Sequence, residues 1–330
     1  MRAVITGASG LVGANLAEAL LREGHHVVGT RRPSSRTDHL SHMEIEWTLA
    51  SLSDPDALTR AFSGADVVFH CAARVEILPR VTQTLYETNV IGTEHVLQAV
   101  RAAKVPRLVH CSSVAAASIS DGTRDVTEED PWNLREHGLA DGYATTKYES
   151  QERVLAATKQ DVDAVVVQPT YMFGPYDIRP SSGQMIIDLA KGRISVNAPG
   201  TQNIVDVRDV ARGMILAWQK GVRGEKYILG CENVTYGELF ARIAAELQIP
   251  APKRTLPFPM VFGLGALAEL GGVLMRKPSE LSRSTARYAY CRGYRFSSEK
   301  AKRELGYSPS STRAAIRACL EWLREQGALR

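Results

Sequence analysis

The sequence predicts an α/β protein: a Rossmann-type, doubly wound parallel sheet with a smaller, mostly helical C-terminal substrate-binding region. Two observations carry this prediction. Short apolar strands alternate with helical segments along residues 2–170, which is the pattern of a parallel sheet covered on both faces. A glycine-rich turn at residues 7–13 follows the first strand and opens a helix, as in dinucleotide-binding units.

Each expected element has a local signal. Residues 11–23 have helical periodicity that ends at Gly24, and Asp54 with Pro55 is typical of a helix start. A long helix is expected over residues 81–103. We expect strands at the short apolar runs 2–6, 26–30, 44–48, 66–70, 107–111 and 164–167.

The domain boundaries are less distinct. Residues 1–170 are expected to form an NADP-binding Rossmann domain, to which residues 201–235 return. Residues 171–330 are expected to form the interleaved substrate-binding region, which is mostly helical from Tyr236 onward. A strand is expected at residues 203–207.

One segment, Leu256 to Met275, is strongly apolar. It contains Pro257, Pro259, Glu269 and several glycines, which make it a poor bilayer span. We interpret it as a hydrophobic helix packed over the substrate pocket, and a peripheral membrane contact is the alternative.

Composition excludes several classes of protein. The chain has 330 residues, 44% of them hydrophobic and 23% charged, as in ordinary globular proteins. The formal net charge of +4, taken as spread along the chain, does not favour nucleic-acid binding. Five cysteines without paired spacing, and a first strand that starts at residue 2, predict a reduced cytoplasmic setting. No histidine has a partner at metal-ligand spacing, so no metal is expected.

Tyr143 and Lys147 open a segment with helical character. Their i, i+4 spacing puts the phenol and the ammonium on one helical face. A lysine beside a tyrosine favours the phenolate and lowers the pKa of the tyrosine, which suits proton transfer to or from an oxygen. Together with the glycine turn, this pair predicts a nicotinamide-dependent carbonyl/alcohol enzyme.

The end of the second strand bears on the choice of cofactor. Residues 30–36 include Arg31 and Arg32, and no acidic residue precedes Asp38. An acid at this place is typical of NAD enzymes, whereas guanidinium groups suit the 2′-phosphate of NADP. The sequence therefore favours NADP(H), and a solvated basic loop is the alternative.

Over nearly its whole length the chain resembles the extended short-chain dehydrogenase/reductase family. Besides the glycine turn and the Tyr143–Lys147 pair, the resemblance rests on ordered segments at residues 69–73, 89–93, 111–113, 168–170, 174–175, 206–211 and 300–307. Residues 173–180 are similar to the dihydroflavonol-reductase and 3β-hydroxysteroid-dehydrogenase-like branch. That branch includes bacterial members labelled hopanoid-associated sugar epimerases.

The resemblance implies a set of roles. Tyr143 is the acid/base, Lys147 also binds the nicotinamide ribose, and Asn89 bends the long helix and positions the lysine through water. Ser113 orients the substrate oxygen, with Ser112 as the alternative. Substrate contacts are implied for Glu76, Ser113, Tyr171 and Met185. Cofactor contacts are implied for Gly7, Ser9, Gly10, Leu11, Val12, Gly13, Arg31, Arg32, Ser51, Leu52, Cys71, Ala72, Ala73, Asn89, Tyr143, Lys147, Pro169, Thr170 and Met172.

Two departures and one assembly prediction accompany these roles. Ser51 stands where the family usually has an aspartate that contacts adenine. Gln202 stands where sugar-nucleotide enzymes usually carry an arginine for the diphosphate, and Pro278 to Ser282 replace their Arg-x-Gly-Asp-like block. The long helix and the Tyr143 helix resemble the pair through which family members form homodimers.

The sequence thus predicts an NADPH-dependent reductase, or the reverse dehydrogenase, of a lipophilic ketone or secondary alcohol. An NDP-sugar epimerase or dehydratase is the enzymatic alternative, with Arg179, Arg193 or Arg208 as candidate partners of a diphosphate. A non-catalytic nucleotide sensor on the same fold is the third class. The retained Tyr143, Lys147 and Ser113 disfavour a sensor, which has no need of an acid/base.

Overall fold

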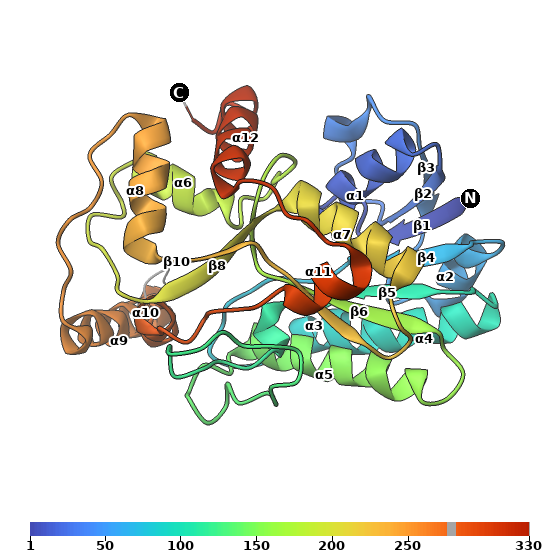
Figure 1. Cartoon of the computed structure of the whole chain (residues 1–330), viewed down its shortest axis with the longest axis horizontal. Coiled ribbons are helices and arrows are strands. Elements are labelled where there is room, and N and C mark those ends of the chain that lie inside the picture. Colours follow the sequence, from blue (N-terminus) through green and yellow to red (C-terminus); the bar gives the residue numbers. More distant parts are fainter. Residues whose placement is uncertain (276–281, 330) are drawn as a thin grey trace.

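A seven-stranded parallel sheet organises the computed structural model, which describes residues 1–275 and 282–329 (Figure 1). Every neighbouring pair in this sheet is parallel, in the order β3-β2-β1-β4-β5-β6-β9. The predicted Rossmann-type fold is confirmed. The strands are β1 Arg2–Thr6, β2 His26–Arg31, β3 Ile45–Leu49, β4 Val67–His70, β5 Leu108–Cys111, β6 Ala164–Pro169 and β9 Lys226–Leu229.

Helices cover both faces of the sheet (Figure 1). Successive strand residues point to opposite faces, so Ile5 and Val4 of β1 belong to different cores. The Ile5 face is covered by α1 Leu11–Arg22, α7 Val207–Lys220 and α11 Glu299–Leu305. The Val4 face is covered by α2 Pro55–Phe62, α4 Gly92–Ala102 and α5 Gly142–Thr158.

The long helix predicted over residues 81–103 is interrupted. It consists of α3 Gln83–Tyr86, a π-helical turn (η2) Glu87–Ile91, and α4. Within the π-turn the carbonyl of Asn89 accepts a hydrogen bond from Thr93 Oγ1 at 2.7 Å. Such wide turns are frequent at functional sites, and the periodicity of the sequence does not reveal them.

A second, three-stranded sheet lies beside the first. It comprises β7 Tyr171–Phe173, β8 Thr201–Asp206 and β10 Glu232–Thr235, with β8 parallel to β7 and antiparallel to β10. Its core is completed by α6 Gly183–Ala190, α8 Tyr236–Leu247 and α12 Thr312–Glu325.

The expected return of residues 201–235 to the Rossmann domain is divided in the structure. The helix α7 and the strand β9 pack with the large sheet, whereas β8 and β10 form the small one. The division arises because β10 pairs antiparallel with β8. The sequence carries no sign of a separate sheet, since it shows only short strands connected by a helix.

The apolar C-terminal segment forms α9 Phe258–Met275, followed by α10 Arg283–Tyr290. One residue of α9, Glu269, lines a cavity beside the start of α5, but the helix leaves much of its apolar surface in solvent: Leu264, Leu267 and Leu270 are 47%, 68% and 68% exposed. The expected packing of this helix over the substrate pocket stays a prediction. Among the described helices, none is long and apolar enough to cross a membrane.

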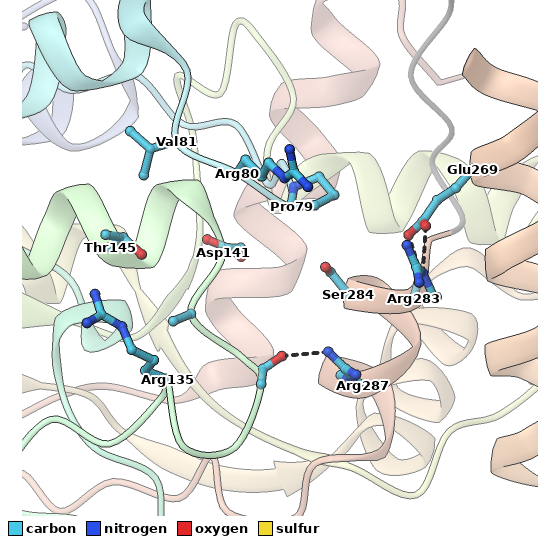
Figure 2. A pocket seen from close by; sticks show the side chains of 12 residues that line it. Pro79, Arg80, Val81, Arg135, Asp141, Thr145, Glu269, Arg283, Ser284 and Arg287 are labelled. Carbon is cyan, nitrogen blue, oxygen red and sulfur yellow. Dashed lines mark hydrogen bonds and ion pairs between the residues drawn. The ribbon is translucent and has the colours of Figure 1, made fainter. Parts of the chain in front are cut away.

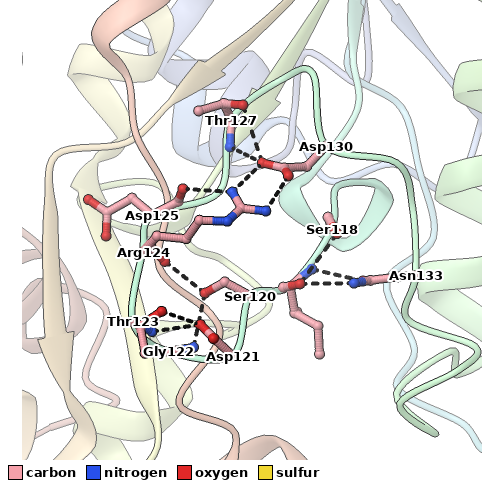
Figure 3. Close-up of polar contacts among 11 residues, drawn as sticks. Ser118, Ser120, Asp121, Gly122, Thr123, Arg124, Asp125, Thr127, Asp130 and Asn133 are labelled. Atoms are coloured by element: carbon pink, nitrogen blue, oxygen red, sulfur yellow. Dashed lines mark hydrogen bonds and ion pairs between the residues drawn. The ribbon is translucent and has the colours of Figure 1, made fainter.

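A polar network fastens the loop between β5 and α5 (Figure 3). Asp130 accepts hydrogen bonds from Arg124 Nη1 at 2.9 Å and from the Thr127 amide at 2.8 Å. Asn133 bonds both the amide and the carbonyl of Ile119 at 2.9 Å. The loop spans the chain between the expected catalytic serine and tyrosine, so these bonds help to fix the start of α5.

We expect Asp130→Asn to destabilise the protein in a pH-dependent way. The Arg124 guanidinium lowers the pKa of Asp130 from 3.8 to about 2, so the charged form stabilises the fold above pH 3.8. The substitution should lower the free energy of unfolding by about 1 kcal/mol at neutral pH, since Arg124 is largely exposed.

Urea unfolding across pH measures the effect. The difference in the free energy of unfolding between the variant and the unmodified protein should disappear as the pH falls from 3.8 towards about 2. Asp161→Asn, which removes the exposed pair with Arg101, is the matched control and should cost less. A pH-independent difference would contradict this role for Asp130.

Candidate active site

The turn after β1 tolerates no side chain at two of its glycines. Gly7 has φ +73°, and a Cβ there would lie 2.7 Å from the backbone of Ala72. A Cβ on Gly13 would lie 2.2 Å from the Gly7 carbonyl oxygen, so this glycine lets α1 pack directly on the turn. Gly10 caps α1 without a side chain, which leaves the first amides of the helix facing outward. This backbone geometry is a candidate cradle for a pyrophosphate.

A hydrogen-bond chain runs from this turn to the π-turn. The Ala72 amide donates to Thr6 Oγ1 at 3.3 Å, and Thr6 Oγ1 lies 2.7 Å from His70 Nδ1. His70 Nε2 lies 3.1 Å from Thr93 Oγ1, which donates to the Asn89 carbonyl. Burial and the nearby Lys147 lower the pKa of His70 to about 3, so the imidazole is neutral and can both accept and donate.

Asn89 joins three segments through its side chain. Its Oδ1 accepts from the Arg74 amide at 2.8 Å, and its Nδ2 donates to the Arg74 carbonyl at 3.0 Å. The same Nδ2 donates to Thr146 Oγ1 at 3.1 Å. Asn89 therefore contacts the residue next to Lys147 and fixes the backbone of the loop after β4.

Lys147 and Tyr143 stand on the same face of α5, but the lysine is directed to the backbone. Its buried Nζ donates to the Cys111 carbonyl at 2.8 Å, and burial lowers the pKa of Lys147. Burial raises the pKa of Tyr143 well above its ordinary value, while the Ser113 hydroxyl beside it acts in the opposite direction. The expected lowering of the tyrosine pKa by Lys147 is thus not what this structure shows.

The two serines after β5 have different surroundings. Ser112 Oγ donates to Gln151 Oε1 at 2.8 Å inside the core, and Gln168 donates to the same oxygen at 3.0 Å. Ser113 Oγ accepts from the Ala115 amide at 3.1 Å and faces Tyr143. Of the two alternatives, only Ser113 presents its hydroxyl to the phenol.

The residues expected around the adenosine lie at the ends of β2 and β3. Neither Arg31 nor Arg32 forms an ion pair with any residue that the structure describes, whereas Arg36 pairs with Asp38 at 2.9 Å. Ser51 bonds Ser53 at 2.9 Å, and the Leu52 carbonyl accepts from His95 at 2.6 Å. Two guanidinium groups are thus available to a phosphate, while the serine that replaces the usual aspartate is engaged locally.

One buried hydroxyl near the sixth strand has no protein partner. Thr170 follows Pro169, the last residue of β6, and its Oγ1 is buried without a hydrogen bond to any described residue. A buried orphan hydroxyl fits a site that a polar ligand completes. The glycine cradle, the two unpaired guanidinium groups and this hydroxyl are all consistent with a nicotinamide dinucleotide.

The expected substrate residues are not brought together in one described cavity. Glu76 is paired with Arg74 at 2.7 Å, and Tyr171 and Met185 pack against the core of the small sheet. Tyr171 and Met185 therefore help to fill the core of the second region.

A cavity of about 550 Å³ lies beside the start of α5 (Figure 2). Asp141 caps this helix by accepting from the Ala144 amide at 2.7 Å, and Tyr288 of α10 donates to Asp141 at 2.9 Å. The cavity contains no predicted site residue. Its lining residues are Pro79, Arg80, Val81, Arg135, Gly138, Ala140, Asp141, Thr145, Glu269, Arg283, Ser284 and Arg287.

Residues 3–230 match the NAD dependent epimerase/dehydratase family. The chain belongs to this family. It is 34% identical to a putative dihydroflavonol 4-reductase of Synechocystis, covering 98% of the chain and 94% of the relative. It is 33% identical to sterol demethylase protein B of Methylococcus capsulatus, covering 99% of both. The crystal structure of gox2253 superposes with a TM-score of 0.87 at 32% identity, covering 100% of this chain and 99% of the other.

Membership of this family confirms the predicted nicotinamide-dependent enzyme of the extended short-chain dehydrogenase/reductase type. Three positioning residues were missed by sequence reasoning. Thr6 and His70 each follow three apolar strand residues, and Thr146 lies inside the Tyr143–Lys147 motif. Their polarity at buried positions is the signal that could have identified them.

We expect substitution of Ser112 to affect mainly stability and substitution of Ser113 to affect mainly turnover. Ser112→Ala should lower the free energy of unfolding by about 1 kcal/mol, because one buried hydrogen bond is lost, and should keep turnover. Ser113→Ala should lower turnover by roughly 100-fold with a smaller loss of stability, because the bond that its Oγ accepts from the Ala115 amide is only partly buried. Urea unfolding and steady-state assays of both variants measure the two effects, and the reverse pattern would assign the role to Ser112.

Proposed function

We propose that this enzyme is an NADPH-dependent reductase, or the reverse dehydrogenase, of a lipophilic ketone or secondary alcohol. The observation that carries the proposal is the meeting of Ser113, Tyr143 and Lys147 at the carboxyl end of β5, two strands from the glycine cradle. An acid/base, a hydroxyl donor and a cation at this edge suit reduction of a carbonyl group.

The protein's own residues would act as follows. Burial keeps Tyr143 protonated, so the phenol can give its proton to an oxygen that gains negative charge. Ser113 orients that oxygen as a hydrogen-bond donor. Lys147 holds the end of β5 and binds the nicotinamide ribose. Bound NADPH, held by the glycine turn and the Arg31–Arg32 loop, supplies the hydride.

Several observations disfavour the sugar-nucleotide alternative. A diphosphate needs cationic partners, and Gln202 instead donates to Tyr236 at 2.8 Å. Arg193 pairs with Asp188 at 3.2 Å, and Arg208 pairs with Asp206 at 2.6 Å. Of the segment Pro278 to Ser282, which replaces the Arg-x-Gly-Asp-like block, residues 278–281 lie outside the described residues. The names of the two relatives, a dihydroflavonol reductase and a sterol demethylase component, favour a lipophilic ring system.

A substrate screen with an acid/base variant tests the proposal. The unmodified protein should reduce steroid, flavonoid, aromatic or alkyl ketones with NADPH, and Tyr143→Phe should lower turnover by at least ~100-fold while still binding cofactor. Tyr148→Phe, on the same helix but stacked on Trp132, is the matched control and should retain activity.

Thermal protection separates the two substrate classes. Lipophilic ketones should raise the unfolding temperature in the presence of cofactor, and UDP or dTDP sugars should not. If only the sugar nucleotides protect the enzyme, the epimerase or dehydratase reading replaces the reductase.

Preference for NADPH should depend on the basic loop. Arg31→Asp together with Arg32→Ala should weaken NADPH binding by roughly tenfold or more and leave NADH binding almost unchanged, because charge-assisted bonds to the 2′-phosphate are lost. Arg36→Ala is the matched control, since Arg36 is engaged by Asp38 in the same loop. Fluorescence titration measures both affinities, and equal affinities in the unmodified protein would refute the preference.

Two further features belong to the proposal. A homodimer through α4 and α5 stays a prediction that light scattering can check. A cytoplasmic location also stays a prediction, supported by five cysteines that are all free thiols.

A further inference from the structure

The helix α9 has two unlike faces. Gly265 lies on the inner face, where a Cβ would be 2.7 Å from the backbone of Ser282, so the helix approaches the start of α10 very closely. On the same face Glu269 pairs with Arg283 at 2.7 Å. This pair involves the only charged side chain of α9, so the contact with α10 neutralises it.

The opposite face of α9 is apolar and open. Spacing of i, i+4 and i+7 puts Met260, Leu264 and Leu267 on one side, where they are 52%, 47% and 68% exposed. Gly263 and Gly271 on this side have no atom within 4 Å of an added Cβ. We call this surface, formed by Met260, Gly263, Leu264, Leu267, Leu270 and Gly271, the outer face of α9. Exposed apolar surfaces of this kind mark interaction sites.

Positive charge is concentrated in the part of the sequence that contains this helix. Residues 253–292 contain seven basic and two acidic residues, a net charge of +5, whereas the whole chain carries +4 and the rest of it therefore −1. The interpretation of the charge as spread along the chain is corrected by this count. Lys253 and Arg254 form no ion pair with any described residue, whereas Arg287 donates to the Gly138 carbonyl at 3.1 Å. In Figure 1, α9 and α10 lie together at one end of the long axis.

We propose that the outer face of α9 docks on an anionic membrane surface, with the helix lying in the plane of the interface and its basic surroundings against the lipid headgroups. An apolar helical face flanked by lysine and arginine is the chemistry that such surfaces bind. A second copy of the chain fits less well, because two-fold pairing through this face would bring two segments of charge +5 together. The proposal does not depend on the substrate of the enzyme.

Cosedimentation with lipid vesicles tests the docking. The unmodified protein should bind vesicles of phosphatidylcholine mixed with phosphatidylglycerol, bind pure phosphatidylcholine more weakly, and dissociate as salt is raised. Leu267→Glu with Leu270→Glu should weaken binding by roughly tenfold or more, since two exposed apolar contacts become charged. Because both side chains are exposed, the fold should be unaffected, and thermal unfolding checks this.

Matched controls identify the cause. Leu49→Glu changes a similarly exposed leucine (58%) on β3 and should bind vesicles as the unmodified protein does. Lys253→Glu with Arg254→Glu should weaken binding to anionic vesicles. Arg60→Glu with Lys159→Glu makes the same change in charge far from α9 in the sequence and should not weaken it. Absence of vesicle binding by the unmodified protein would overturn the proposal. So would a change from dimer to monomer in the Leu267→Glu, Leu270→Glu variant, which would assign the face to a second copy.

Discussion

Two very close backbone approaches lie at the carboxyl end of β1, and the placement of the other groups follows from them. Gly7 lies against the backbone of Ala72, and Gly13 lies against the carbonyl of Gly7, at separations that no Cβ could occupy. The turn after β1, the loop after β4 and the start of α1 therefore converge on one point. Parallel pairing then puts the ends of β5 and β6 at the same edge of the sheet, so the proposed catalytic residues stand beside the proposed dinucleotide site.

Polar contacts extend this convergence to α5. The chain of hydrogen bonds through Thr6, His70 and Thr93 ends on Asn89, whose side chain holds Arg74 and Thr146. On the other side α10 reaches the same helix, because Tyr288 donates to the capping Asp141. The helix that carries Tyr143 and Lys147 is thus fixed at its first turns by both the Rossmann sheet and the C-terminal region. A buried network of this kind specifies one geometry only because each member is satisfied.

Local patterns predicted the elements of the large sheet closely, and nonlocal contacts explain the differences. Apolar runs and caps such as Asp54 are readable because they act within a few residues. The π-turn at Asn89, the division of residues 201–235 and the exposure of α9 depend on partners far away in the chain. The same holds in the site: the motif located Tyr143 and Lys147, but the direction of the Lys147 ammonium towards Cys111 and the net rise in the tyrosine pKa come from burial. The tandem serines could be told apart only when Gln151 was seen beside Ser112.

The π-turn fixes the number of residues that the chain can have between Glu87 and Ile91. A π-turn is equivalent to one residue inserted in an α-helix, and one residue rotates whatever follows by about 100°. Deletion of a single residue between Glu87 and Ile91 would therefore leave a continuous helix. The residues before the deletion and those after it could then no longer both keep their present orientation. Either Asn89 would turn away from Arg74, or Val96 and Val100 of α4 would leave the core. Any natural chain that shares this arrangement must keep the extra residue, so insertions and deletions are forbidden here even though helix propensity alone would permit them.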